Sequence, residues 1–269
     1  MSSDALSGHG PAVRPEDLKM AEIWLTGHGL PDVRPTPLLA VRLAVRRRAR
    51  LANAILPAGL FIGAALAYVS GESGLHAMVP VLILIVLVVG MLLAQALLDR
   101  WVRRVDRRAG EALPRRTAHL AQPGWQALLG RPRAVFIVAT FAGATALVVS
   151  ALTVQDADAR YAALVVLVGV AGAGAGIVLQ LRDLLARPIV AEDEASLTAD
   201  VIMRIEDARE AGMPTVPWSL PVVLIFGAAP LWWKVASIAL VIIGMIALIV
   251  ITTRTPSSVT TARRVMSLS

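Results

Sequence analysis

The sequence predicts an all-α polytopic membrane protein with six transmembrane helices arranged as three hairpins. Three observations support this fold class. Of the 269 residues, 57% are hydrophobic and only 17% are charged, whereas soluble domains carry about 25% charged residues. The apolar residues form long blocks without charge, while soluble amphipathic helices place them at every third or fourth position. The third observation is a lopsided distribution of arginine along the chain, described below.

The N-terminal segment, 1–50, is expected to be cytoplasmic and to contain a short amphipathic helix. In "RPEDLKMAEIWLTGHG", Pro15 favours a first helical turn and Gly27 favours a stop. The acidic residues after Pro15 suit the positive end of the helix dipole. The apolar face of this helix is expected to lie on the membrane surface, on a partner, or on the chain's own inner loops. A Gly- and Pro-rich linker and an arginine-rich flank complete the segment.

Six windows are apolar and long enough to cross a hydrocarbon core of about 30 Å, which takes about 20 helical residues. The expected spans are 51–69 and 77–98, 134–154 and 161–181, and 216–233 and 235–251. Only Lys234 separates the last two, and Pro230 disfavours one continuous helix through both. This third pair, 216–251, is expected to be either a sharp hairpin that crosses the membrane or a re-entrant pair that does not.

The arginines predict the orientation of these spans. With the N-terminus inside, the inner segments are 1–50, 99–133, 182–215 and 252–269. They contain all 26 basic residues except two, Arg160 and Lys234. Basic residues next to span ends favour the cytoplasmic side. The sequence therefore predicts a multi-pass protein of the cell (plasma) membrane, with both termini cytoplasmic.

Two arginine clusters are expected to act as topology anchors through attraction to anionic lipid. A net charge of +7 is also compatible with nucleic acid binding, but the clusters lack interleaved aromatic side chains that stack on bases. Membrane lipid is thus an expected partner and nucleic acid is not. The anchors are Arg46, Arg47, Arg48, Arg50, Arg103, Arg104, Arg107 and Arg108.

Glycines recur at four-residue spacing inside two spans. Gly59 and Gly63 form one such pair, and Gly172 and Gly176 form another with Gly169 nearby. Small residues allow the backbones of membrane helices to approach closely. We expect these glycines to pack helices within the bundle or between protomers of a homo-oligomer. The alternative is that they line a pore or a substrate path.

Charged residues are absent from all six expected spans, which argues against a proton-driven transporter or a voltage sensor. The amides Asn53, Gln95 and Gln180 lie near the inner ends. They are expected to make interhelical hydrogen bonds or to give a cavity a polar lining on the cytoplasmic side. The chain has no cysteine, and its histidines show no metal-ligand spacing. No nucleotide or hydrolase motif is present. We therefore predict no catalytic residue, no cofactor, no metal and no enzymatic activity.

The two long inner segments differ in charge. Segment 99–133 is basic, and the second span is expected to continue into it as a helix through "LLDRWVRRVDRRAGEAL". Segment 182–215 is acidic and predicts an amphipathic helix that ends at Gly212 and Pro214. Its apolar stripe is expected to pack against the inner side of the bundle or to dock a cytosolic partner, and its acidic face can pair with 99–133. The stripe consists of Leu197, Val201, Ile205 and Ala208.

The layout resembles the membrane subunit of ATP-driven (ABC-type) transporters, which have six spans, an inner N-terminal surface helix and inner helices that engage a separate ATPase. In "AEDEASLTADVIMRIEDARE" and its arginine-rich flanks, the chain also resembles uncharacterised six-span integral membrane proteins of high-GC actinobacteria. Both resemblances concern the layout of the chain. They imply a fold and a class of function, and they assign a role to no residue.

The function expected from the layout is that of a membrane subunit in a transport complex with a cytosolic partner such as an ATPase. Segment 184–211 or 99–133 is the expected coupling element. One alternative is a non-catalytic membrane scaffold or regulatory anchor that recruits a cytosolic protein. A second alternative is a small self-contained channel or carrier.

Overall fold

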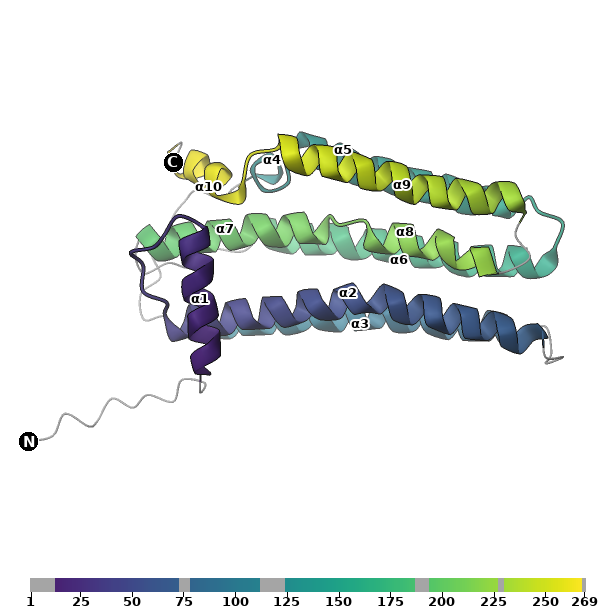
Figure 1. Cartoon of the computed structure of the whole chain (residues 1–269), viewed down its shortest axis with the longest axis horizontal. Coiled ribbons are helices and arrows are strands. Elements are labelled where there is room, and N and C mark those ends of the chain that lie inside the picture. Colours follow the sequence, from purple (N-terminus) through teal and green to yellow (C-terminus); the bar gives the residue numbers. More distant parts are fainter. Residues whose placement is uncertain (1–12, 73–77, 112–123, 187–193, 227–229, 268–269) are drawn as a thin grey trace, which may run out of the picture.

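The computed structural model describes residues 13–72, 78–111, 124–186, 194–226 and 230–267, and every regular element within these ranges is helical (Figure 1). This confirms the all-helical prediction. The elements are α1 (Pro15–Gly27), α2 (Pro37–Glu72), α3 (Met78–Glu111), α4 (Trp125–Leu128), α5 (Arg131–Ala151), α6 (Ala157–Ala186), α7 (Glu194–Ala211), α8 (Thr215–Val223), the 3₁₀ helix η1 (Leu224–Phe226), α9 (Leu231–Arg254) and α10 (Ser258–Ser267).

Five helices in the described residues are long and apolar enough to cross a membrane, namely α2, α3, α5, α6 and α9. Between 11% and 28% of the most apolar stretch of each is buried within the chain. Large apolar side chains such as Ile62, Val86 and Ile243 are more than 60% exposed. Such a surface is stable in hydrocarbon and not in water. The chain is therefore a membrane-embedded helical protein.

The expected span 216–233 is not one long helix. α8 ends at Val223, the 3₁₀ turn follows, and α9 begins at Leu231 with Pro230 as its N-cap. Pro221 inside α8 has no N–H for the helical ladder, which weakens the helix at this point. α8 and η1 together are about 20 Å long. Lys234 lies in the first turn of α9 rather than in the expected turn between two spans.

α8 nevertheless occupies the centre of the bundle. Figure 1 shows three tiers, with α2 beside α3, α6 beside α8, and α5 beside α9. α8 packs against α2, α5, α6 and α9. Leu220 of α8 is fully buried, and it shares a core cluster with Val88 of α3, Val170 of α6 and Trp233 of α9. The Trp233 indole donates to the Leu147 carbonyl over 2.9 Å, which ties α9 to α5.

One end of the bundle continues into a second layer of structure, here called the terminal layer. It comprises α1, α4, α7, α10 and the adjoining ends of α2, α3 and α6, with α1 lying crosswise to the long helices (Figure 1). α7 is at its centre, and its buried residue Ile202 packs in a cluster with Leu128, Leu184 and Ala262. α1 and α10 lie at the same end of the molecule.

The expected helices outside the spans are confirmed within the described residues. α1 starts at Pro15 and ends at Gly27, and Leu25 of α1 is buried while Ile23 is 55% exposed. α3 continues past its apolar window to Glu111, and the remainder of segment 99–133 up to 123 lies outside the described residues. α7 ends at Ala211, directly before the expected stop.

Candidate functional site

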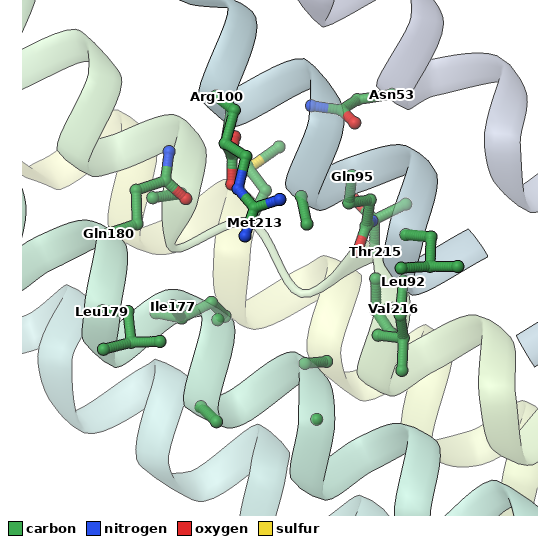
Figure 2. Close-up of a pocket in the computed structure, with 18 of the residues that line it drawn as sticks. Asn53, Leu92, Gln95, Arg100, Ile177, Leu179, Gln180, Met213, Thr215 and Val216 are labelled. Carbon is green, nitrogen blue, oxygen red and sulfur yellow. The ribbon is translucent and has the colours of Figure 1, made fainter. Parts of the chain in front are cut away.

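A cavity of about 580 Å³ lies beside the non-helical connection 212–214 between α7 and α8, here called the α7–α8 interruption (Figure 2). Its walls come from α2, α3, α6 and the connection between α7 and α8. Met213 of that connection and Thr215, the first residue of α8, both line it. Four separate parts of the chain therefore meet around one space inside the bundle.

The interruption has a local cause. Gly212 is buried, and a Cβ built on it would lie 2.6 Å from Ile137 Cδ1 of α5, so a larger residue here would require the Ile137 side chain to move. Pro214 has no N–H to continue the helical ladder. The next helix restarts with Trp218 donating its N–H to the Pro214 carbonyl over 3.1 Å. The chain can therefore leave the α7 axis at 212–214 and begin α8 beside the cavity.

One end of the cavity is polar and the other is apolar. Figure 2 shows the amides Asn53, Gln95 and Gln180 around its upper part, with Leu92 and Val216 lower down. Asn53 Oδ1 is buried and has no hydrogen-bond partner among the described residues. The structure thus brings the three amides singled out in the sequence to one cavity, from three different helices. A buried carbonyl oxygen without a donor indicates that the cavity can supply one.

Charged residues gather at the polar end. Asp99, Arg100 and Arg103 come from α3, and Glu210 comes from α7. Arg103 forms a long ion pair of 3.6 Å with Asp183 of α6. The other three form no ion pair with a described residue. In Figure 2, Arg100 extends over the α7–α8 connection.

The five glycines singled out in the sequence divide into two groups. A Cβ at Gly63, Gly169 or Gly172 would lie 2.6 to 3.0 Å from a side chain of a neighbouring helix, so these three glycines lie at close contacts between helices. A Cβ at Gly59 or Gly176 would meet nothing within 4 Å. The packing role therefore does not apply to these two within the chain. Gly176 instead lines the cavity, which is the alternative that the sequence left open.

Next to the cavity, a buried network of ion pairs joins α2, α3 and α7. Arg46 donates to both carboxylate oxygens of Asp106 and of Asp207 over 2.8 to 3.0 Å. Arg42 bridges Asp106 and Asp200 at 3.0 and 2.7 Å. The Arg46 and Asp106 side chains are each 6% exposed. Such a planar guanidinium held by two carboxylates fixes both the distance and the orientation of three helices.

The arginines predicted as topology anchors therefore differ in what they do. Arg46 is a buried structural residue, and Arg50 approaches Glu206 at 3.4 Å. Arg103 pairs with Asp183. The remaining five are exposed, although Arg48 also lies 4.0 Å from Asp17 of α1: Arg47, Arg48, Arg104, Arg107 and Arg108.

The apolar stripe of α7 is packed inside the terminal layer. Val201, Ile205 and Ala208 are at most 1% exposed, and Leu197 packs against the same cluster. The structure thus favours packing over docking, because no face of the stripe is open to a partner. The acidic residues of α7 pair mainly with arginines of α2, and from segment 99–133 the carboxylate Asp106 joins the same network.

His28 connects α1 to α7. Its Nδ1 lies 2.6 Å from the Trp24 carbonyl and its Nε2 lies 2.8 Å from Glu206 Oε1. Both partners accept, so both contacts are hydrogen bonds only when both ring nitrogens carry a proton. The hydrogen bond to Glu206 raises the His28 pKa above 6.5, against the effect of burial. Burial disfavours ionised Glu206, yet His28 and Arg50 lower its pKa below 4.5.

Sequence reasoning missed Arg42, Asp106, Asp200 and Asp207. A signal was present, since Arg42 and Arg46 are four residues apart and Asp200 and Asp207 are seven apart. Both pairs therefore lie on one face of their helix. No signal in the sequence shows that these faces meet.

The comparisons with known proteins add no relative. No protein-family model matches the chain, and neither the curated proteins nor the solved structures include a significant match.

Replacing Arg46 tests the ion-pair network. Arg46→Ala removes the shared partner of two buried carboxylates, and we expect it to lower the free energy of unfolding by about 3–5 kcal/mol. Arg47→Ala is the matched control, because Arg47 is the exposed neighbour on the same helix. Its expected effect is within about 0.5 kcal/mol. Denaturant unfolding of the two variants in detergent measures this difference, and equal effects would contradict a structural role for Arg46.

Attachment of α1 to α7 is expected to depend on pH. The raised His28 pKa gives stability that is complete below pH 6.5 and is lost as the pH rises through the raised value. The lowered Glu206 pKa gives stability that is complete above pH 4.5 and is lost as the pH falls through the lowered value. Hydrogen exchange of the α1 amides, corrected for intrinsic rates, should show less protection at about pH 8.5 than at about pH 6. His28→Gln should remove this difference, and a difference that persists in this variant would exclude His28 as its cause.

Proposed function

We propose that the chain is the membrane subunit of a transport complex that works with a cytosolic protein such as an ATPase. The observation that carries this proposal is the interrupted α7–α8 segment, which lines a cavity of about 580 Å³ between α2, α3 and α6.

An interrupted helix inside a membrane needs a compensating environment. Hydrocarbon offers no hydrogen bonds, so irregular backbone at membrane depth is tolerated where it is buried in protein or lines a cavity that admits water or a ligand. Many transporters place their substrate at discontinuous helices near the middle of the membrane. The connection at 212–214 lies where the terminal layer joins the bundle; it is covered by α5 at Gly212 and lines the cavity at Met213.

The same segment offers a mechanical link to a partner. α7 is fixed to α2 and α3 by the ion pairs of Arg42 and Arg46, and three residues further on the chain enters α8. A displacement of the terminal layer would therefore move one wall of the cavity. Because the α7 stripe is buried, we assign the partner-facing surface to the exposed arginines of α3, which are Arg104, Arg107 and Arg108.

The proposal includes an orientation. Five crossings alone would place α1 and α10 on opposite sides of the membrane, yet both lie at one end of the bundle. We propose that α8 and η1 supply a sixth, interrupted crossing. The exposed arginines lie at the end that carries α1 and α10, which favours a cytoplasmic position for that end in the plasma membrane.

One observation favours the second candidate function, a non-catalytic scaffold. The terminal layer is cross-linked by buried ion pairs and displays exposed arginines, as a rigid platform for an acidic partner would. The cavity has no role in a scaffold, and for this reason we place transport first. A self-contained carrier would use the cavity without a partner.

Purification from native membranes in mild detergent separates these functions. We expect a partner with ATPase activity to co-purify with the full-length chain. The variant Arg104→Glu/Arg107→Glu/Arg108→Glu should lower its yield about tenfold, since each reversal replaces attraction by repulsion. Arg263→Glu/Arg264→Glu on α10 is the charge-reversal control, with two reversals instead of three, and it should retain the partner.

The other outcomes contradict the proposal. A co-purifying partner without ATPase activity would favour the scaffold. A folded chain that binds no partner, yet takes up solute when reconstituted in vesicles, would favour the self-contained carrier.

A further inference from the structure

We propose that the cavity at the α7–α8 interruption binds a zwitterionic amphiphile, with a phosphate and a primary ammonium in its headgroup and a hydrocarbon chain. This is the chemistry of a phosphatidylethanolamine lipid. The inference names the substrate class of the proposed transport site and rests on that function for its role, although binding itself can be tested without transport.

The shape of the cavity indicates an elongated ligand. Its α3 wall extends from Val89 to Arg103, which is about 21 Å along the helix axis. The apolar part of the lining includes Leu92, Ile177 and Val216, and the charged groups are confined to one end. A ligand that is polar at one end and apolar along its length matches this distribution.

The cavity opens sideways toward the hydrocarbon. Leu93 of α3 and Leu179 of α6 both line it, and they are 58% and 65% exposed. Side chains that are both cavity-lining and exposed on two neighbouring helices mark a lateral opening. An amphiphile can therefore enter from the membrane without passing through water. Gly176 keeps this wall free of a side chain, since a Cβ there would meet nothing within 4 Å.

The charges at the polar end fit a phosphate next to an ammonium. Arg100 has no ion pair with a described residue, and Arg103 has only the 3.6 Å contact with Asp183. Guanidinium groups bind phosphate through paired N–H donors. Glu210 and Asp99 line the same end and form no ion pair with a described residue. A primary ammonium has three N–H donors for these carboxylates and for the orphaned Asn53 Oδ1.

Headgroups of other types fit less well. A purely anionic headgroup would satisfy the arginines but leave Glu210 and Asp99 next to its negative charge. A quaternary ammonium has the right charge but no N–H to donate to a carboxylate or an amide oxygen. A positive charge next to the carboxylates and N–H donors for the amide oxygen are both required. Among lipids with equal acyl chains, a headgroup with a primary ammonium meets both requirements.

The test is lipid binding by the full-length chain in detergent, followed by native mass spectrometry. Phosphatidylethanolamine, phosphatidylcholine and phosphatidylglycerol with identical acyl chains are compared. We expect phosphatidylethanolamine to bind about tenfold more tightly than either of the others. Glu210→Gln is expected to remove the preference over phosphatidylcholine, and Arg100→Gln to weaken binding of all three.

A filled cavity gives the matched test of location. Gly176→Leu places a side chain into the cavity and should lower phosphatidylethanolamine binding about tenfold. Gly59→Leu is its control, because Gly59 also has nothing within 4 Å but does not line the cavity. It should bind as the natural chain does. Thermal unfolding of each variant shows whether it is folded.

Three results would overturn the inference. They are equal binding of the three lipids, a preference for phosphatidylglycerol, and unchanged binding by a folded Gly176→Leu variant. Loss of lipid preference with the ATPase partner retained would refute the substrate class alone. Lipid preference without an ATPase partner would refute the proposed complex and leave the binding site intact.

Discussion

The structure depends on one constraint, which is that a backbone polar group in hydrocarbon must find its hydrogen bond within the protein. The five long helices meet it along most of their length, with Pro57 of α2 as an internal exception, so their side chains can face lipid. α8 cannot meet it alone, because prolines interrupt its ladder and the chain leaves helical geometry before it and after it. It is accordingly surrounded by α2, α5, α6 and α9.

The interruption and the buried ion pairs belong together. Burying Arg46 with Asp106 and Asp207 costs desolvation free energy. Ion pairs of this kind contribute more to a defined geometry than to stability. They hold the start of the α7–α8 segment while the remainder of it lines a cavity. The result is a segment fixed at one end and bordered by open space at the other. Such a segment can transmit a displacement of the terminal layer to the cavity wall.

The sequence predicted what local chemistry decides. Apolar windows predicted the five long helices. Pro15 and Gly27 predicted the two ends of α1, and Gly212 predicted the end of α7. The prediction of one helix over 216–233 was wrong because an apolar window reports hydrophobicity and not helix continuity. Pro217 and Pro221 lie within this window, and like Pro230 they have no N–H for a continuous helix. The anchor role of Arg46 was inferred from its position at a span end. Its burial depends on the facing carboxylates of α3 and α7, 60 and 161 residues away. A single sequence does not show which helices, far apart along the chain, contact each other.

The central claim is that α8 and η1 form an interrupted crossing, and labelling of introduced cysteines tests it most directly. The chain has no cysteine of its own, so each site reports alone. Leu231 at the start of α9 is 77% exposed, so a cysteine introduced at this position is accessible to a reagent. Asp158→Cys and Arg264→Cys mark the two ends of the bundle. The account predicts that a membrane-impermeant maleimide labels positions 231 and 158 from the same side, opposite to 264. Labelling of 231 from the side opposite to 158, with 264 on the side of 158, would contradict it.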